Sequence, residues 1–158
     1  MPIDPAVLAD PERFMRQALE VAATSIEAGD LPIGALAIHD GEVIASAHNR
    51  RTIDADPLAH AELLAIAQAA RNLGEWRLNE VTIVVTLEPC PMCAGAMWAA
   101  RIGGVVYGAA DLKAGAVGSL YNMGSDPRLN HEFDVRPRVL EQECAGILTK
   151  FFEARRGA

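Results

Sequence analysis

The 158-residue sequence is poor in cysteine, and this excludes one class of protein at the outset. It holds 3 cysteines, whereas small secreted domains built on disulfides need many, in even numbers. Two of the three, Cys90 and Cys93, stand three positions apart in the stretch LEPCPMCAGAMW. A close pair in such a chain indicates metal binding or catalysis rather than a disulfide framework.

Lysine and arginine are also scarce, with 14 of them against 21 aspartates and glutamates and a formal net charge of −7. This balance disfavours an extended contact with nucleic acid, because phosphate contacts need basic side chains. The charge is uneven, however. Residues 1–79 hold 6 basic and 12 acidic side chains, and residues 101–158 hold 8 and 7. Any contact with a polyanion should therefore use the C-terminal third.

The sequence lacks a long apolar run. The longest runs have the length of a strand, and the first residues, MPIDPAVLADPERF, are acidic and rich in proline. We therefore expect no signal peptide, no membrane span, no membrane partner and a cytoplasmic location. With this length, 51% hydrophobic residues and no internal repeat, we expect residues 1–158 to form a single domain.

Hydrophobic periodicity and turn signals predict alternating helices and strands. Residues 10–29 indicate a helix with Asp10 as its N-cap, and residues 33–49 indicate a hairpin that turns at Asp40 and Gly41. The sequence favours further helices at 58–74, 91–103 and 139–156, and buried strands at 81–87 and 104–109. This order predicts an α/β domain whose mixed sheet is covered by helices on both faces.

The cysteine pair and a histidine begin two of the predicted helices. His60 opens one, in LAHAELL, and Cys90 and Cys93 open the helix after the strand over 81–87. A helix that follows a strand starts at the carboxyl edge of the sheet, where binding sites form. Three such ligands leave one tetrahedral position of zinc open, which is typical of catalytic zinc. Glu62, two residues after His60, can then serve as general acid and base.

Two other interpretations of the pair stay open from the residues alone. A bare C-x-x-C motif is also typical of a thioredoxin-like redox pair, although proline stands on both sides of Cys90 here. A structural zinc site would need a fourth ligand, which Cys144, His39, His48 or His131 could supply. The combination of H-x-E with P-C-x-x-C about 30 residues later is rarer than its parts, and it favours the catalytic site.

These two motifs resemble the signature of the zinc-dependent nucleoside and nucleobase deaminases. Over about 11–156 the chain is similar in particular to the bacterial tRNA-adenosine deaminases, in LPIGALAI, HNR, DPLAHAE, TLEPCPMCAGAM, VVYGAADLKAGAVGSL and LNH. The resemblance implies a cytidine-deaminase-like three-layer α/β/α sandwich with a mixed central sheet. It also implies one Zn²⁺ per subunit, a homodimer, and conversion of adenosine to inosine at the wobble position of an arginine tRNA anticodon arm.

The resemblance also implies roles for individual residues. His60, Cys90 and Cys93 would hold the zinc, and Glu62 would move protons while activated water attacks C6 of adenine. Further positions match those that contact the substrate in the family: Asn49, Pro32, Ile33, Gly34, Ala61, Asp111, Lys113 and Asn130. On the last predicted helix, Phe151 and Phe152 could stack on bases, with Phe152 in the predicted site, and Arg155 and Arg156 could contact phosphates. Equally, one phenylalanine could belong to the core and the arginines could form a solvated helix end.

Two other functions remain to be separated from this one. A deaminase of free guanine, cytosine or a nucleoside would use the same metal and Glu62. The acidic charge favours it, as do Leu58, Ala110 and Glu132, which replace residues common in the tRNA branch. A non-catalytic, zinc-stabilised RNA-binding subunit is the other alternative. Glu62 opposes it, because a purely structural metal site has no use for a carboxylate beside an open position.

Overall fold

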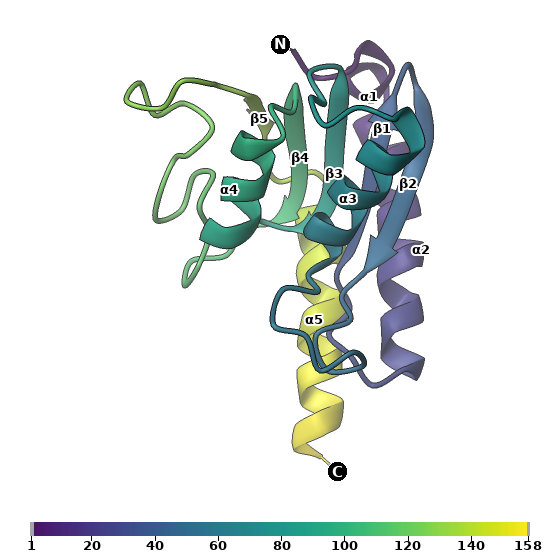
Figure 1. Cartoon of the computed structure of the whole chain (residues 1–158). Coiled ribbons are helices and arrows are strands. Elements are labelled where there is room, and N and C mark those ends of the chain that lie inside the picture. Colours follow the sequence, from purple (N-terminus) through teal and green to yellow (C-terminus); the bar gives the residue numbers. More distant parts are fainter. Residues whose placement is uncertain (1, 158) are drawn as a thin grey trace.

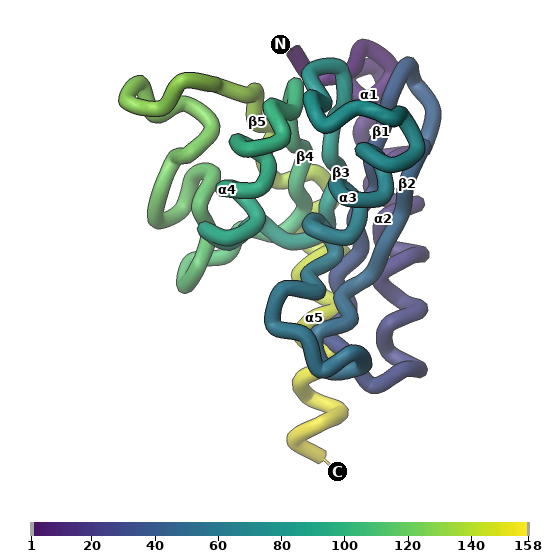
Figure 2. The backbone as a smooth tube through the Cα atoms, viewed as in Figure 1, coloured from purple at the N-terminus to yellow at the C-terminus, as the bar shows by residue number. Residues whose placement is uncertain are grey.

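The computed structural model describes residues 2–157, in which helices and strands largely alternate (Figures 1 and 2). The helices are α1 (Pro5–Ala9), α2 (Pro11–Glu27), α3 (Ala61–Leu73), α4 (Pro91–Ala99) and α5 (Glu141–Arg156). The strands are β1 (Gly34–His39), β2 (Glu42–His48), β3 (Val81–Leu87), β4 (Gly104–Ala109) and β5 (Asp134–Arg136). The two shortest elements, α1 and β5, were not predicted from the sequence. No helix within residues 2–157 is long and apolar enough to cross a membrane.

The strands form one mixed sheet in the order β2-β1-β3-β4-β5. β1 pairs antiparallel with both β2 and β3, while β3, β4 and β5 run parallel. The hairpin between β1 and β2 turns at Asp40 and Gly41, which both have positive φ, at 54° and 76°. Two consecutive left-handed residues are what a two-residue hairpin turn requires, and the Asp-Gly pair supplies them.

Helices cover both faces of the sheet, which gives three layers (Figure 1). Successive strand residues point to opposite faces. In β1, Ala35 packs toward α3 and α4, and Leu36 packs toward α2 and α5. The two faces carry two separate apolar clusters, so the central strands β3 and β4 are buried on both sides. This is why their sequences are nearly continuous apolar runs rather than alternating ones.

The parallel arrangement of β3 and β4 decides where a site can form. Both strands end at the same edge, with Leu87 of β3 paired to Ala109 of β4. The loop after β3 leads directly into α4, and the N-terminus of α3 lies at the same edge of the sheet (Figure 1). Two helix starts and the two strand ends therefore enclose one region.

Candidate metal centre and substrate pocket

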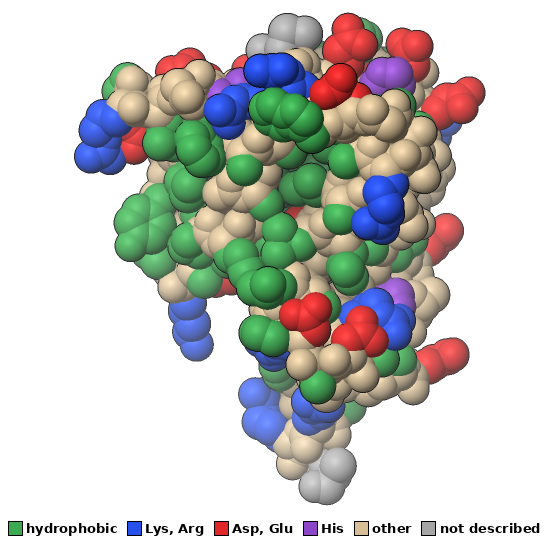
Figure 3. Space-filling view, viewed as in Figure 1, with side chains coloured by type: hydrophobic (Ala, Val, Ile, Leu, Met, Phe, Trp, Pro, Cys, Tyr) green, Lys and Arg blue, Asp and Glu red, His purple; other side chains and the backbone are tan. Residues whose placement is uncertain are grey.

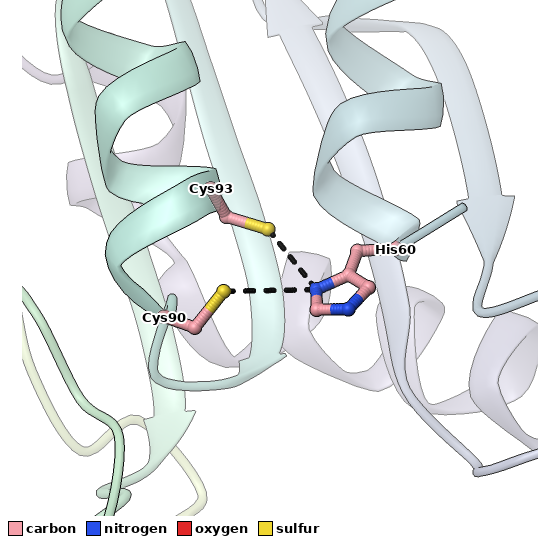
Figure 4. A group of neighbouring side chains, drawn as sticks. All are labelled: His60, Cys90 and Cys93. Carbon is pink, nitrogen blue, oxygen red and sulfur yellow. Dashed lines mark hydrogen bonds between the residues drawn. The ribbon is translucent and has the colours of Figure 1, made fainter. Parts of the chain in front are cut away.

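His60 and Cys90 are the N-cap residues of α3 and α4. A side chain at an N-cap usually accepts a hydrogen bond from an N–H group of the first turn. Neither His60 nor Cys90 does so. Their side chains instead point toward each other across the gap between the two helices, and Cys93, in the first turn of α4, points into the same gap (Figure 4).

The three side chains have the separations of a metal-binding group. The Nδ1 atom of His60 lies 3.3 Å from Sγ of Cys93 and 3.7 Å from Sγ of Cys90, and the three donor atoms all lie within 4.8 Å of one another. Ligands of a tetrahedral zinc ion, at bond lengths of about 2.0–2.3 Å, are about 3.6–3.8 Å apart. The spacing and the soft sulfur and nitrogen donors fit a metal ion.

The two thiols differ in their affinity for protons. The pKa of Cys90 falls to about 4, first because the Cys93 thiol donates a hydrogen bond to it and then because His60 does. The Cys90 thiolate in turn raises the pKa of Cys93, and burial raises it further. The pair therefore shares one proton, and a metal ion that binds both sulfurs has to displace it.

Glu62 lies in the first turn of α3 and is buried, with 5% of its surface exposed. Burial is the main reason why its pKa rises to about 7, and the negative charge of Cys90 raises it further. A carboxyl group with a pKa near neutrality can both take up and release a proton at neutral pH. Glu62 thus has the position and the proton affinity of a general acid and base beside the metal-binding group.

A cavity of about 180 Å³ opens beside the metal-binding group. It is lined by Leu31, Ile33, Asn49, Arg51, His60, Ala61, Glu62, Leu87, Glu88, Cys90, Asp111 and Ala114. A larger and shallower hollow of about 500 Å³ lies elsewhere, lined in part by His39 and Glu80. That hollow contains none of His60, Cys90 and Cys93, so the smaller cavity is the candidate substrate pocket.

The pocket contains seven of the residues proposed from the sequence. These are Ile33, Asn49, His60, Ala61, Glu62, Cys90 and Asp111. Cys93 reaches the metal-binding group from below the pocket surface, where it is fully buried. The structure does not place Pro32, Gly34, Lys113, Asn130, Phe152, Arg155 or Arg156 among the lining residues.

Gly34 has a packing role instead. A Cβ atom at this position would lie 2.2 Å from the carbonyl oxygen of Ala18 and 2.6 Å from the backbone nitrogen of Ala22. The glycine therefore lets β1 approach the backbone of α2. Pro32 is buried between the lining residues Leu31 and Ile33, and it directs the chain into β1.

Asn130 lies at the other end of β4 from the pocket. The next residue, His131, bonds through Nε2 to the carbonyl oxygen of Ile102, 2.8 Å away. The chain then enters β5, whose Asp134 pairs with Gly104 at the beginning of β4. The pocket lies beyond the end of that strand, so Asn130 cannot reach it within the same chain.

The C-terminal helix α5 places its three proposed RNA-contacting residues at the surface, away from the pocket. Phe152 is 45% exposed and meets the ring of buried Phe151 edge-on. Arg155 donates a 3.0 Å hydrogen bond to the carbonyl oxygen of Gly29 and lies over the Phe151 ring. Arg156 is exposed. Arg155 thus joins α5 to the turn after α2, whereas Arg156 faces solvent.

This difference leads to a prediction for the two arginines. Arg155→Ala should lower Tm by roughly 2–4 °C, because it removes the bond to Gly29 and the contact with Phe151. Arg156→Ala should leave Tm unchanged and weaken RNA binding, with a flatter salt dependence. Thermal unfolding and binding titrations at several salt concentrations measure both effects. Equal Tm values for the two variants would contradict the structural role of Arg155.

Asp30 is a residue of this site that the sequence did not reveal. It is 2% exposed, and its carboxylate accepts hydrogen bonds from the side-chain nitrogen of Asn49 at 2.9 Å and from the backbone of Leu31, Thr52 and Ile53. Burial alone would raise its pKa, but the three backbone donors outweigh this and lower it. An ionised carboxylate only accepts hydrogen bonds, so it fixes which end of the Asn49 amide faces it.

The possible fourth ligands of a structural site all have other partners. His48 bonds through Nδ1 to the hydroxyl of Ser25 at 2.7 Å, and His39 pairs with Glu80. His131 is held by Ile102, as described above, and Cys144 is buried against Gly108. Within residues 2–157, the one metal-capable group of three or more ligands is His60, Cys90 and Cys93. This composition favours a metal with an open position over a closed structural site.

The chain is similar to known deaminases in both sequence and structure. Residues 9–156 match the MafB19-like deaminase family. The tRNA-specific adenosine deaminase of Bacillus subtilis (strain 168) is 47% identical over 145 residues, which cover 92% of this chain and 90% of that protein. The protein of the same name from Haemophilus influenzae is 42% identical over 146 residues, covering 92% and 84%.

Two solved structures have the same fold as this chain. One, from a study of A-to-I editing by tRNA deaminases at the wobble position of transfer RNA, is 44% identical with a TM-score of 0.82, and the match covers 86% of this chain and 99% of that one. A guanine deaminase from Nitrosomonas europaea is 26% identical with a TM-score of 0.75, covering 89% and 84%. The predicted cytidine-deaminase-like fold is confirmed.

The layered sheet, the His-Cys-Cys group at its carboxyl edge and the buried glutamate beside that group define a hydrolytic deaminase of nucleobases. The identity over almost the whole chain then narrows the class. The chain belongs to the family of the tRNA-specific adenosine deaminases.

Proposed function

We propose that this enzyme converts adenosine to inosine at the wobble position of a tRNA anticodon, with water as co-substrate and ammonia as the second product. The observation that carries the proposal is the cavity in which Glu62, Asn49 and the His-Cys-Cys group meet. The 44% identity with a wobble-position tRNA deaminase of the same fold supports this substrate. Within the chain, we propose that residues 1–158 act as a single deaminase domain.

We propose zinc as the metal, one ion per subunit, held by His60, Cys90 and Cys93. Two thiolates and an imidazole form a donor set that suits zinc, and a hydrolytic deamination needs no redox change. Zinc in such a site lowers the pKa of water to about 7 and so supplies a nucleophile at neutral pH. The start of α4 stabilises the thiolate charge of Cys90 through its N–H groups and dipole.

Glu62 moves the protons of the reaction. Water that adds to C6 of adenine loses one proton, which goes to ring nitrogen N1. The new C6 hydroxyl then loses the second proton of that water, which goes to the amine so that it leaves as ammonia, and the C6 oxygen becomes the carbonyl of inosine. Glu62 lines the cavity and its pKa is raised by burial to about 7, so the same carboxyl can accept each proton in turn and pass it on, first to N1 and then to the amine. Its burial also keeps bulk water from competing as a proton donor.

The remaining lining residues would hold the base. Asn49 offers an amide whose orientation Asp30 fixes, and such an amide can bond to a polar edge of adenine. Ile33, Leu87 and Ala61 supply apolar surface against the ring. A pocket of this size admits a single unstacked base, and an anticodon loop presents its bases in that form.

Exposed residues outside the pocket would contact the rest of the anticodon arm. Lys113 and Arg156 are exposed and can reach phosphates, and exposed Phe152 can stack on a base. Basic side chains gather near the C-terminal end of α5, on the same side of the molecule as the pocket edge of the sheet (Figure 3). The proposal that the substrate is an arginine tRNA rests on the sequence resemblance.

We further propose that the enzyme is a cytoplasmic homodimer. Apolar side chains gather over α4 and the loop that follows β4 (Figure 3), and that loop contributes Leu120 and Tyr121, which are 54% and 59% exposed. A monomer rarely leaves large apolar patches in water. A second copy of the chain would cover this surface, and sedimentation equilibrium would give the mass of a dimer.

The first experiment offers the zinc-loaded enzyme an adenosine-containing anticodon stem-loop and, in parallel, free guanine, cytosine and adenine. We expect ammonia release with the stem-loop and one inosine per loop, at the wobble position. The likeness to a guanine deaminase makes free guanine the main competitor. Turnover of guanine without turnover of the stem-loop would overturn the proposed substrate and leave the deaminase chemistry in place.

A further inference from the structure

Glu88 is a buried carboxylate that the proposed chemistry does not use. It follows the last residue of β3 and precedes Cys90 by two positions, and 2% of its surface is exposed. Its backbone N–H bonds to the carbonyl oxygen of Ala109, which continues the pairing of β3 with β4. It is one of the residues that line the pocket. Burying a charge is costly unless hydrogen bonds compensate it, so its partners indicate its role.

Within residues 2–157, the side-chain hydrogen-bond partners of Glu88 all belong to one loop, residues 111–119. Oε1 accepts hydrogen bonds from the backbone N–H of Asp111 at 3.1 Å and from the hydroxyl of Ser119. Oε2 accepts from the backbone N–H groups of Val117 at 3.3 Å and Ser119 at 3.0 Å. Each oxygen therefore has two donors, and the carboxylate fastens the loop at both of its ends.

The glycine of the loop lets the backbone close around this carboxylate. A Cβ atom at Gly115 would lie 2.3 Å from both Cδ and Oε2 of Glu88. No other amino acid fits there without moving the loop away. The stretch AGAVGSL therefore matches a loop built around a buried carboxylate, with Gly115 for clearance and Ser119 as a double donor.

The loop carries two residues that the proposed function places next to the RNA. Asp111 lines the pocket, and its Oδ1 accepts hydrogen bonds from the backbone of Lys113 and Ala114 at 3.0 and 3.1 Å. Lys113 is exposed at the tip of this turn. The position of both side chains thus depends on the turn, and the turn is attached to the protein core through Glu88.

We propose that Glu88 is a positioning residue for RNA binding: it holds the 111–119 loop so that Asp111 and Lys113 face the anticodon. This inference rests on the proposed function. It assigns Glu88 to the binding of the RNA and not to the proton transfers, which belong to Glu62. Substitution of Glu88 should therefore weaken the affinity for the stem-loop and leave the rate of the chemical step nearly unchanged.

The test variant is Glu88→Gln, which keeps the shape of the side chain but replaces one of its two acceptor oxygens by an NH₂ group. An amide has one oxygen and one NH₂ group, so two of the four donors now face a group that cannot accept. If the loop keeps its binding arrangement for about a tenth of the time, KM for the stem-loop rises about tenfold. Saturating RNA selects that arrangement, so kcat should stay within about threefold of the wild type.

Asp4→Asn is the matched control. Asp4 is also a buried carboxylate, 8% exposed, and accepts backbone hydrogen bonds from Ala6 at 2.8 Å and Gly41 at 3.0 Å. It lies beside the hairpin turn, at the other end of β1 from the pocket. Asp4→Asn should lower Tm and leave KM unchanged, which separates loss of stability from loss of positioning.

The outcomes decide between the two proposals. If the wild type does not turn over the stem-loop, the proposed function fails. If the wild type does and Glu88→Gln has an unchanged KM, or loses kcat alone with its metal content intact, the inference about Glu88 fails. Should Glu88→Gln not fold, Ser119→Ala removes a single donor and should raise KM about two- to fivefold; an unchanged KM there overturns the inference equally.

Discussion

Glu62→Gln should reduce kcat for deamination by about 10²–10⁴ while the protein keeps its metal ion and its fold. The reason is that Glu62 lines the pocket and has a pKa raised to about 7 by burial, yet is not one of the three residues of the metal-binding group. Glutamine has nearly the same shape but cannot take up and return a proton. Steady-state kinetics with the stem-loop and metal analysis of the same sample measure both properties.

Glu62→Ala extends this test, and an exposed carboxylate provides its control. Glu62→Ala should lose activity to the same degree and still bind roughly one metal ion per chain. Glu42→Gln, on the exposed side of β2, should keep full activity. Loss of the metal from both Glu62 variants would make Glu62 a structural support of the metal site. Full activity in either variant would remove it from the reaction.

Local sequence patterns were sufficient for most of the fold. The run VTIVVTL predicted β3 at its observed bounds, because a strand buried on both faces must be apolar throughout. The Asp10 cap and the Asp40-Gly41 turn were equally local. β5 was missed because it is three residues long, is mostly exposed and pairs with the first residues of β4 alone. Such a strand has no alternation that a pattern could detect.

The site residues also differ in whether a local sequence pattern identifies them. His60, Cys90 and Glu62 could be inferred because helix starts that follow strands converge at one edge of a sheet. Asp30 and Glu88 could not, because their partners are distant in sequence: Asn49 lies 19 positions from Asp30, and Ser119 lies 31 from Glu88. The signal was present as an isolated acidic residue next to a proline motif, in GDLPIG and in TLEPCP, but an isolated carboxylate has no periodicity.

Two residues that the resemblance assigned to the substrate do not line the pocket of this chain. Gly34 stands in a motif shared with the deaminases, but its lack of a side chain serves the contact between β1 and α2. Asn130 is likewise part of a shared motif, and the chain fold carries it to the far end of β4. A motif shows that a position is constrained. It does not show whether the constraint comes from packing or from the substrate, and only the tertiary contacts distinguish the two.

Cys93→Ala should abolish metal binding, and with it both activity and a large part of the thermal stability. Cys93 is fully buried, lies 3.3 Å from Nδ1 of His60, and is one of just two sulfur donors in the group. A bound ion at 1,000 times its Kd stabilises the folded state by about 4 kcal/mol. At this chain length, removing that contribution should lower Tm by roughly 8–16 °C. Chelator-treated wild type should show the same fall, and added zinc should reverse it in the wild type alone.

Cys144→Ala is the control that distinguishes the effect of losing the metal from the effect of losing a buried cysteine side chain. Cys144 is also fully buried, but its sulfur lies against Gly108 and the carbonyl oxygen of Val139 rather than in the metal-binding group. This variant should lose some stability through the cavity it creates, keep one metal ion per chain, and remain active. Retention of the metal by Cys93→Ala would contradict the three-ligand site. Loss of the metal from Cys144→Ala would mean that the packing of α5 on β4, and not the ligand set alone, holds the ion.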